Sequence, residues 1–225
     1  MSQISLSNYV PGIGPIGAKL AIIGIAPGDK EVEKGEPFAA DGPSGRILRA
    51  DLREAGTSIE HVYRTNIFKY QLPDNEFKKH QEIGLNLQAA IVDLEKEIRD
   101  VNPNCILGLG DPVLYALANK SGKANGINVW RGSILNTLNY KSIFTWHPAN
   151  ELHGAGEGQW KTWQRYVRKF DVKRAVEQSK FKEIRLPNRL LHNAKSSIDV
   201  IRYFEKNKSQ VHCAVDIESI EGIPV

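Results

Sequence analysis

The stretch Leu20-Ala-Ile-Ile-Gly-Ile25, followed by Ala26-Pro27-Gly28, decides the fold class of this chain. It is a short, continuous apolar run that ends at a proline and a glycine, which is typical of a buried strand that enters a turn. Similar short runs occur at residues 62–68, 105–109 and 143–146. Strands that are apolar on both faces are typical of parallel sheets covered by helices.

Segments with helical spacing lie between these strands, at residues 43–55, 77–100 and 159–178, and a short helix is expected to open at Gly110. Residues 130–132 are expected in a loop or an edge strand. The alternation predicts a three-layer α/β/α fold with a central, mainly parallel four-stranded sheet, plus a short C-terminal extension.

Special or polar residues follow three of the predicted strands. Ala26-Pro27-Gly28 follows the first strand, Asn66 ends the second, and His147 follows the fourth. Ligands of open α/β sheets bind beyond the carboxyl ends of the strands. The sequence therefore predicts a ligand site where these loops meet.

The charge is unevenly distributed along the 225 residues, whose net charge is +4. Residues 160–210 hold 14 Lys and Arg against 5 Asp and Glu, whereas residues 1–159 hold 16 against 18. A basic tail on a near-neutral body is expected of a protein that contacts phosphates. A solvated helix face and linker is the alternative.

No run approaches the roughly 20 apolar residues of a membrane span, and the first 17 residues lack the features of an export signal. Cys105 and Cys213 are far apart in apolar surroundings, so we expect buried thiols. These observations predict a cytoplasmic protein without a membrane partner.

The composition changes after residue 180. We expect one domain over residues 1–180, a basic linker over 181–209, and the first strand of a further, truncated domain over 210–225. A lone strand cannot pair its backbone or bury its faces. The chain is therefore expected to be the front part of a longer protein.

Four short motifs resemble the uracil-DNA glycosylase superfamily, and most closely its family 4, the bacterial and archaeal iron–sulfur branch. The motifs are Gly24-Ile-Ala-Pro-Gly28, Gly35-Glu-Pro-Phe38, Thr65-Asn66-Ile-Phe-Lys69 and His147-Pro148-Ala149. Leu107-Gly-Leu-Gly110 and Arg131-Gly132 also match landmarks of that family. The resemblance covers residues 18–178 and implies a glycosylase that binds an extruded base in DNA.

The resemblance assigns the base-binding residues. Phe38 would stack on uracil, Asn66 would pair with the N3 and O4 edge, and His147 would donate to O2, where negative charge builds as the glycosidic bond breaks. The turn from Ala26 to Gly28 would let the backbone approach the base closely. The alternatives are a core phenylalanine, a loop-bracing asparagine and a histidine that satisfies a backbone carbonyl.

Two positions depart from the family pattern. Ile25 stands where the family has the acid that orients the attacking water, and Asp29, Glu31 or a backbone-held water is expected to replace it. Tyr70 stands where the family has a cluster cysteine. With two cysteines, an iron–sulfur cluster held by four thiolates is not expected, and no cofactor is expected for the glycosylase-like domain.

Five residues are predicted to contact DNA. Leu152, in a glycine-rich loop, would be the wedge that fills the gap left by the extruded base. The cationic side chains expected near phosphates are Lys69, Arg131, Lys161 and Arg165. The alternatives are a plain surface loop and ordinary surface charges.

The stretch Ala214-Val-Asp216-Ile-Glu218 resembles the first motif of the 3′–5′ exonuclease domain of family A DNA polymerases. There the Asp and Glu bind divalent metals, so Asp216 and Glu218 would be ligands only in a complete exonuclease domain. Glycosylase-like domains ahead of such polymerases are known in phages. The resemblance implies replication proteins, or a polymerase chain in cis, as partners in the cytoplasm of a bacterium or a phage-infected host.

Two functions follow from these observations. The first is a DNA glycosylase that excises uracil or a modified uracil. The second is a catalytically silent glycosylase fold that acts as a DNA- or partner-binding module of the polymerase. The preferred base, the preference for single or double strands and the oligomeric state stay open.

Overall fold

Five strands form one sheet in the order β2-β1-β3-β5-β4. The strands are β1 (Leu20–Gly24), β2 (Tyr63–Asn66), β3 (Cys105–Leu109), β4 (Ile134–Thr137) and β5 (Tyr140–Thr145). β2, β1, β3 and β5 run parallel to one another, and β4 pairs with β5 in the antiparallel direction. The predicted fold class is confirmed, and the four predicted strands correspond to the parallel ones.

The fifth strand is the main correction to the predicted sheet. β4 and β5 are joined by Leu138 and Asn139, which both have positive φ angles, 51° and 64°. A two-residue hairpin turn of this type needs positive φ angles at both positions, and its usual sequences are Asn-Gly and Asp-Gly. Because Leu-Asn gives no such signal, β4 was not predicted, and β5 begins three residues earlier than expected. Trp130 ends a short helix, α5 (Ile127–Trp130), and does not lie in a loop or edge strand.

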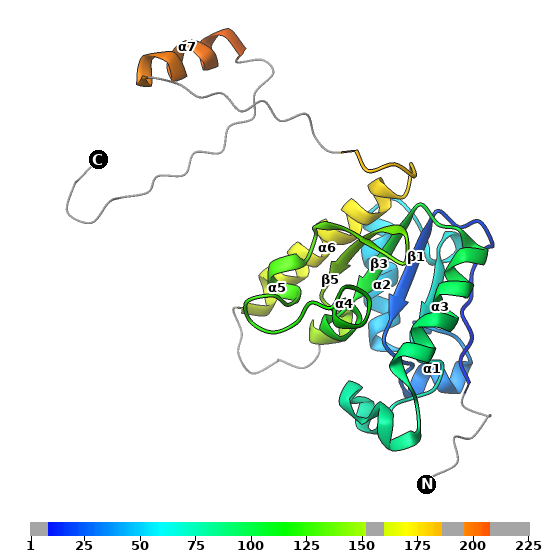
Figure 1. The fold of residues 1–225 in the computed structure, drawn as a ribbon. Coiled ribbons are helices and arrows are strands. Elements are labelled where there is room, and N and C mark those ends of the chain that lie inside the picture. The colour runs from blue at the N-terminus through cyan, green and yellow to red at the C-terminus, as the bar shows by residue number, and fades with distance from the viewer. Residues whose placement is uncertain (1–8, 152–159, 186–195, 208–225) are drawn as a thin grey trace. The chain divides into compact units, whose positions relative to one another are not determined.

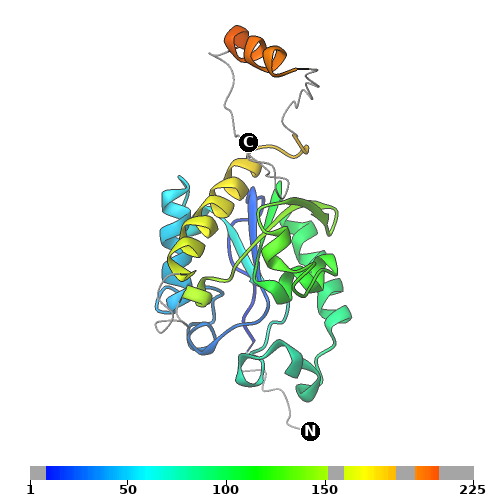
Figure 2. The same ribbon diagram turned by 90° about the vertical axis from the view of Figure 1, so that its left-hand side faces the viewer.

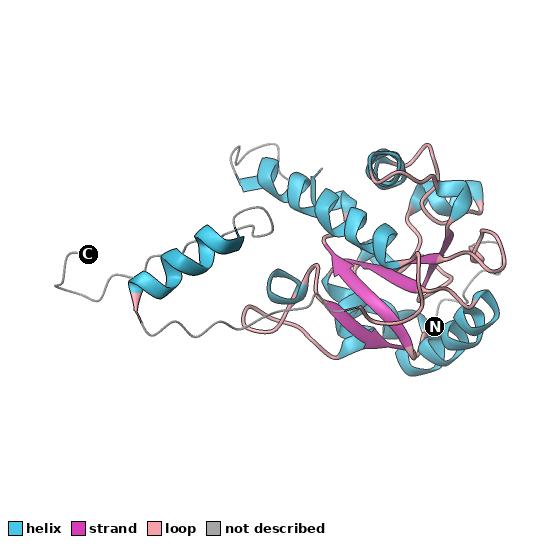
Figure 3. Ribbon diagram, turned by 90° about the horizontal axis from the view of Figure 1, so that it is seen from above, coloured by secondary structure: helices cyan, strands magenta, loops and turns pink. Residues whose placement is uncertain are grey.

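Helices cover both faces of the sheet, as Figure 2 shows with the sheet seen nearly edge-on. α2 (Pro43–Glu54) and α6 (Trp160–Gln178) pack on one face, and α3 (Leu87–Val101) and α4 (Asp111–Ala118) pack on the other. The view from above in Figure 3 shows the strands between these helices. A shorter helix, α1 (Asp29–Lys34), follows β1 where a loop was expected.

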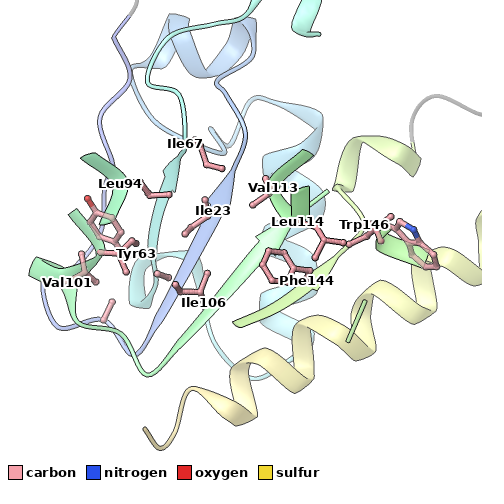
Figure 4. Close-up of a cluster of buried hydrophobic side chains, with 14 residues drawn as sticks. Ile23, Tyr63, Ile67, Leu94, Val101, Ile106, Val113, Leu114, Phe144 and Trp146 are labelled. Atoms are coloured by element: carbon pink, nitrogen blue, oxygen red, sulfur yellow. The ribbon is translucent and has the colours of Figure 1, made fainter. Parts of the chain in front are cut away.

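The two cores follow from the alternation of side chains along the strands. Leu20 and Ile22 of β1 face α2 and α6, whereas Ala21 and Ile23 face α3 and α4. Figure 4 shows the second of these clusters, in which Ile23, Ile106 and Phe144 of three strands meet residues of the helices. Burial on both faces explains why the strands are apolar throughout.

The predicted helix over residues 77–100 is divided in two. A 3₁₀ segment, Phe77–Ile83, ends at Gly84 with a φ of 76°, and α3 begins afterwards at Leu87. Asn86 caps α3 by accepting a hydrogen bond from the Ala89 N–H at 2.9 Å. The break places the 3₁₀ segment after β2, on the same side of the sheet as the predicted site.

The computed structural model describes residues 9–151, 160–185 and 196–207. The chain divides into two compact units, Met1–Ile184 and Arg185–Val225. The first contains the sheet and α1 to α6 (Figure 1). In the second, the described element is helix α7 (Ser197–Asn207), which exposes Ile198 and Ile201. Within the described ranges, no helix combines the length and the apolar character of a membrane span.

Candidate functional site

The candidate site lies where four parallel strands end at one edge of the sheet. β1 ends at Gly24, β2 at Asn66, β3 at Leu109 and β5 at Thr145. From β1 the chain crosses to β2 on one side and later to β3 on the other, so a crevice is expected between the diverging connections. Two further hydrogen bonds, from Ile67 N to Gly24 O and from Phe68 N to Ile25 O, extend the β1–β2 pairing into the loops.

Phe38, Asn66 and His147 meet at this edge, although they come from three separate loops. A Cβ atom added to Gly24 would collide with Asn66 Oδ1 and lie 3.0 Å from Phe38 Cζ. The rings of Phe38 and His147 have centroids 6.4 Å apart. The three side chains therefore lie close together beyond the end of β1, and a side chain at position 24 would displace the Asn66 amide.

Asn66 presents a buried amide that is not fully satisfied. The residue is 1% exposed, and its Nδ2 atom has no hydrogen-bond partner among the described residues. A buried donor left unpaired costs about 1–3 kcal/mol. Such a group is expected to be paired by a water or a ligand that offers an acceptor, so the amide is a candidate for contact with a ligand atom.

The backbone of Phe38 is held from both sides by charged side chains. Phe38 has a φ of 54°, a conformation that is unfavourable for a residue with a Cβ. Glu31 accepts a hydrogen bond from its N–H, and Arg49 Nη1 donates to its carbonyl oxygen at 2.5 Å. Arg64 Nε donates to the preceding carbonyl, of Pro37, at 2.9 Å. These contacts fix a conformation that the chain would otherwise avoid.

Glu31 uses both carboxylate oxygens in this loop. Its second oxygen accepts from the Gly28 N–H at 2.7 Å, and burial raises the pKa of the carboxyl while the two backbone hydrogen bonds oppose that rise. Asp29 is exposed and accepts from Gln71 Nε2 at 2.6 Å. Glu31 thus links the turn after β1 to Phe38. The roles of Glu31 and Asp29 in handling water stay predictions.

His147 follows β5 and packs closely against the loop after β3. A Cβ atom on Gly110 would lie 3.4 Å from His147 Cβ, and Gly110 has a φ of 97°. The Ala149 N–H donates to His147 Nδ1 at 3.2 Å. With Nδ1 accepting, the hydrogen of the neutral ring is on Nε2. The imidazole can therefore act as a hydrogen-bond donor through Nε2.

Lys69 forms its hydrogen bonds within the protein, and its predicted contact with phosphates stays a prediction. Its Nζ donates to Thr65 Oγ1, to the carbonyl oxygen of Asn66 at 2.8 Å and to Glu97 Oε2 at 2.5 Å. The hydroxyl of Tyr63 donates to the other Glu97 oxygen at 2.8 Å. Burial lowers the pKa of Lys69, and the neighbouring Glu97 carboxylate opposes this shift. The ammonium group therefore fixes the backbone that carries the Asn66 amide.

Arg131 also forms an ion pair within the protein, and its predicted contact with DNA stays a prediction. Its Nη1 contacts both oxygens of Asp171, at 2.9 and 3.0 Å, and Thr145 Oγ1 donates to the same carboxylate at 2.7 Å. Arg165 is more than half exposed and lies 3.3 Å from Glu151. Arg165 is therefore the predicted cation that the structure places at the surface.

Some of the remaining predicted residues lie within the described ranges, and others lie outside them. Ala26 and Gly28 lie partly exposed in the turn after β1. The predictions for Leu152, Asp216 and Glu218 lie outside the described residues, as does the prediction for the side chain of Lys161.

The donors present do not fit an iron–sulfur cluster held by four thiolates. The chain has two cysteines, and Cys105 lies inside β3, where burial raises the pKa of its thiol to about 12. Tyr70, at the position of the family's cysteine, packs edge-on against Tyr9 with ring centroids 5.5 Å apart. In the described part of the chain, no group of three or more His, Cys, Asp or Glu side chains could hold a metal ion.

Comparison with known proteins assigns the fold to a family. Residues 11–170 match the profile described as the uracil DNA glycosylase superfamily, which is more than half of the chain. The chain belongs to the uracil DNA glycosylase superfamily. The four motifs around Gly24, Phe38, Asn66 and His147 lie within the matched residues.

Relatives within the superfamily carry the name type-4 uracil-DNA glycosylase. The chain is 30% identical over 158 residues to the protein of Archaeoglobus fulgidus, covering 65% of this chain and 73% of the relative. It is 32% identical over 149 residues to that of Thermotoga maritima, with coverage of 65% and 73%. For that of Saccharolobus solfataricus, the identity is 33% over 152 residues, with coverage of 65% and 68%.

The sequence did not reveal the residues that hold the site together. Glu97 and Arg49 gave no signal, since charged residues on helices are common, and Gly24 was noticed only as part of a motif. Arg64 did give a signal in the sequence, because a charged side chain inside a buried strand needs a partner. Arg64 is 7% exposed, and its Nη2 pairs with Glu36 Oε2 at 3.1 Å.

Proposed function

We propose that this protein is a DNA N-glycosylase that releases uracil, or a modified uracil, by hydrolysis. The observation that carries the proposal is the unpaired Nδ2 of Asn66, buried between Phe38 and the end of β1. An amide offers a donor for O4 and an acceptor for the N3–H of uracil. Membership of the superfamily and the names of the relatives support the same activity.

The chemistry then follows from the three side chains. Phe38 stacks on the ring, and Asn66 reads its edge. As the bond from N1 to the sugar C1′ breaks, its electron pair moves onto the base, and His147 stabilises the charge at O2 through Nε2–H. Water adds its oxygen to C1′, and the base leaves with a proton. The products are free uracil and an abasic site.

An oligonucleotide assay tests this activity. The protein is incubated with labelled DNA containing one uracil, treated with alkali and analysed by gel electrophoresis, with a thymine oligonucleotide as the matched control. We expect strand breaks at uracil alone. Intact uracil DNA, beside an active glycosylase that cleaves the same sample, would reject the proposal.

Lys69 is expected to act as a positioning residue, because its ammonium group holds the Asn66 carbonyl. A hydrogen bond to a charged group contributes about 1.5–3 kcal/mol, so Lys69→Met should lower kcat for uracil release about tenfold or more. Binding of DNA with a tetrahydrofuran abasic analogue should not change, because that site has no base for Asn66 to read. Lys96→Met, which removes an exposed lysine of α3, serves as control, and an equal loss of uracil release and of abasic-DNA binding in Lys69→Met would contradict the role.

Ile25→Glu distinguishes an enzyme from a silent module. A positioned general base contributes about 10²–10⁴-fold, and Ile25 instead packs its side chain against the core. We therefore expect Ile25→Glu to raise the rate of uracil release at least about tenfold. An unchanged rate would show that no acid is missing at this position. If both proteins bind DNA in a salt-dependent manner and release no base, the silent binding module is correct.

We also propose that this glycosylase-like domain is joined in cis to a family A DNA polymerase and serves replication or repair. The resemblance of Asp216 and Glu218 to the first exonuclease motif supports the link, with domain limits at residues 1–180, 181–209 and 210–225. Divalent metal would bind there only in a complete exonuclease. The site of action would be the cytoplasm of a bacterium or phage-infected host. Coding sequence beyond codon 225 that lacks polymerase motifs would refute this arrangement.

A further inference from the structure

A hollow lies on the same side of the sheet as the base site. It has a volume of about 1210 Å³ and is lined by the segment that follows β2, including Phe77 and His80, and by α4, including Pro112 and Tyr115. The segment and α4 follow β2 and β3, so the cleft opens beyond the carboxyl ends of those strands. None of its lining residues belongs to the base site.

The cleft wall adjoins the base site at two points. A Cβ atom on Gly110 would lie 3.4 Å from His147 Cβ and 3.6 Å from Pro112 Cδ, so one residue separates the imidazole from the cleft wall. On the other side, the ring of Phe68 stacks on His80 with centroids 5.3 Å apart. Phe68 comes two residues after Asn66, so the loop that carries the base-reading amide also supports the cleft.

Aromatic rings form one wall of the cleft. The rings of Phe77 and His80 stack with centroids 5.3 Å apart, and Phe77 meets Tyr115 edge-on at 6.0 Å. Tyr115 is 41% exposed, and Phe77 and His80 are partly exposed. Accessible aromatic faces are the platforms on which proteins stack unpaired bases, and stacking tolerates any base sequence.

Polar side chains accompany the aromatic wall, as contacts to nucleotides require. Gln81 and Gln88 supply amides that can both donate and accept, and Lys78 supplies a positive charge. The Glu76 carboxylate also lines the cleft and pairs with Lys79 Nζ at 3.4 Å. The nearby Asp111 carboxylate is turned to the backbone, where it accepts from the Ile127 N–H at 2.8 Å. The volume exceeds the roughly 300–1,000 Å³ of a small-ligand pocket, so linked nucleotides fill the cleft better than one isolated base.

We propose that this cleft binds unpaired nucleotides next to the extruded base on the same strand. The inference rests on the proposed function and deepens it, because it names single-stranded DNA as the preferred substrate. In a duplex, neighbouring bases cover each other's faces, whereas in a single strand the faces are available to Phe77 and Tyr115. The base site and the cleft then hold successive nucleotides of one strand.

A fluorescence experiment tests the cleft without requiring catalysis. Single-stranded oligonucleotides carry a tetrahydrofuran residue in place of the target nucleotide and 2-aminopurine one or two positions to its 5′ or 3′ side. We expect wild-type protein to change the 2-aminopurine emission on one side, through stacking on the aromatic wall. Tyr115→Ala should abolish that change and weaken single-strand affinity roughly 5- to 150-fold, whereas duplex affinity stays within about twofold.

Tyr166→Ala is the matched control, since Tyr166 is an exposed tyrosine, 59% accessible, on α6. It should leave both measurements unchanged. Equal losses for the two variants, equal losses on single strands and duplexes, or no emission change on either side would overturn the inference. Failure of the proposed function can be told apart from failure of this inference. The proposed function fails if the gel assay shows no release of uracil, whereas the fluorescence test uses DNA without uracil and depends only on binding.

Discussion

Asn66→Ala is expected to reduce kcat/KM for uracil release about 10³-fold, because it removes the amide that pairs with the base edge. The same substitution should not lower stability as buried polar substitutions commonly do. The Asn66 Nδ2 atom is buried and has no partner in the described part of the chain, so alanine removes an unsatisfied donor. We expect the Tm to stay constant or rise while activity falls. Single-turnover kinetics and thermal unfolding measure the two effects.

Asn104→Ala provides the matched control for this result. Asn104 is also a buried asparagine, but its Nδ2 donates to the Ser179 carbonyl at 2.7 Å. Its replacement leaves that carbonyl unpaired and should lower the Tm without a specific loss of uracil release. If Asn66→Ala released uracil at the wild-type rate, Asn66 would not read the base, and the assignment of the site would be wrong.

Arg168→Met is expected to cause the largest loss of stability, about 3–5 kcal/mol in the free energy of unfolding. Arg168 Nε pairs with Asp51 Oδ2 at 2.7 Å, and the two side chains are 3% and 2% exposed. Its Nη2 also contacts Glu151, in the 3₁₀ segment Pro148–Glu151 that follows His147. Removing the guanidinium leaves a buried carboxylate without its partner. In a chain of this size the loss corresponds to a fall in Tm of about 6–20 °C.

Two variants distinguish a buried ion pair from a general effect of lost charge. Lys169→Met removes the neighbouring cation, whose partner Glu54 is largely exposed, and should change stability by less than about 1 kcal/mol. Asp51→Leu combined with Arg168→Met removes both buried charges and should recover part of the stability lost in the single variant. Equal Tm values for Arg168→Met and Lys169→Met would refute the importance of the buried pair.

The sequence predicted the sheet well because its signals were local. A short, continuous apolar run indicates a strand that is buried on both faces of a parallel sheet, and the four predicted runs correspond to β1, β2, β3 and β5. The hairpin at Leu138 and Asn139 escaped prediction, because its left-handed conformations depend on the strands around it and not on a favourable turn sequence. The break before α3 was missed, because residues 77–100 keep apolar positions on both sides of Gly84.

The candidate site was predictable in part for the same reason. Phe38, Asn66 and His147 belong to short motifs, and the edge where they meet follows from the strand order. The burial of Lys69 could not be foreseen, since its partner Glu97 is 28 residues away on a helix with many other charges. A cation in a motif is ambiguous until its environment is known, because a buried partner and a phosphate attract it by the same chemistry.

The hydrogen bonds that Glu31, Arg49 and Arg64 make with residues 37 and 38 all go to main-chain atoms. These hydrogen bonds do not depend on which side chain residue 38 carries, so they can still form when the ring is exchanged. The ring itself is 2% exposed and packs in the core cluster with Leu48 and Leu52, so a larger ring would have to displace its neighbours. The main chain of this loop and the ring of Phe38 are therefore held by separate sets of contacts.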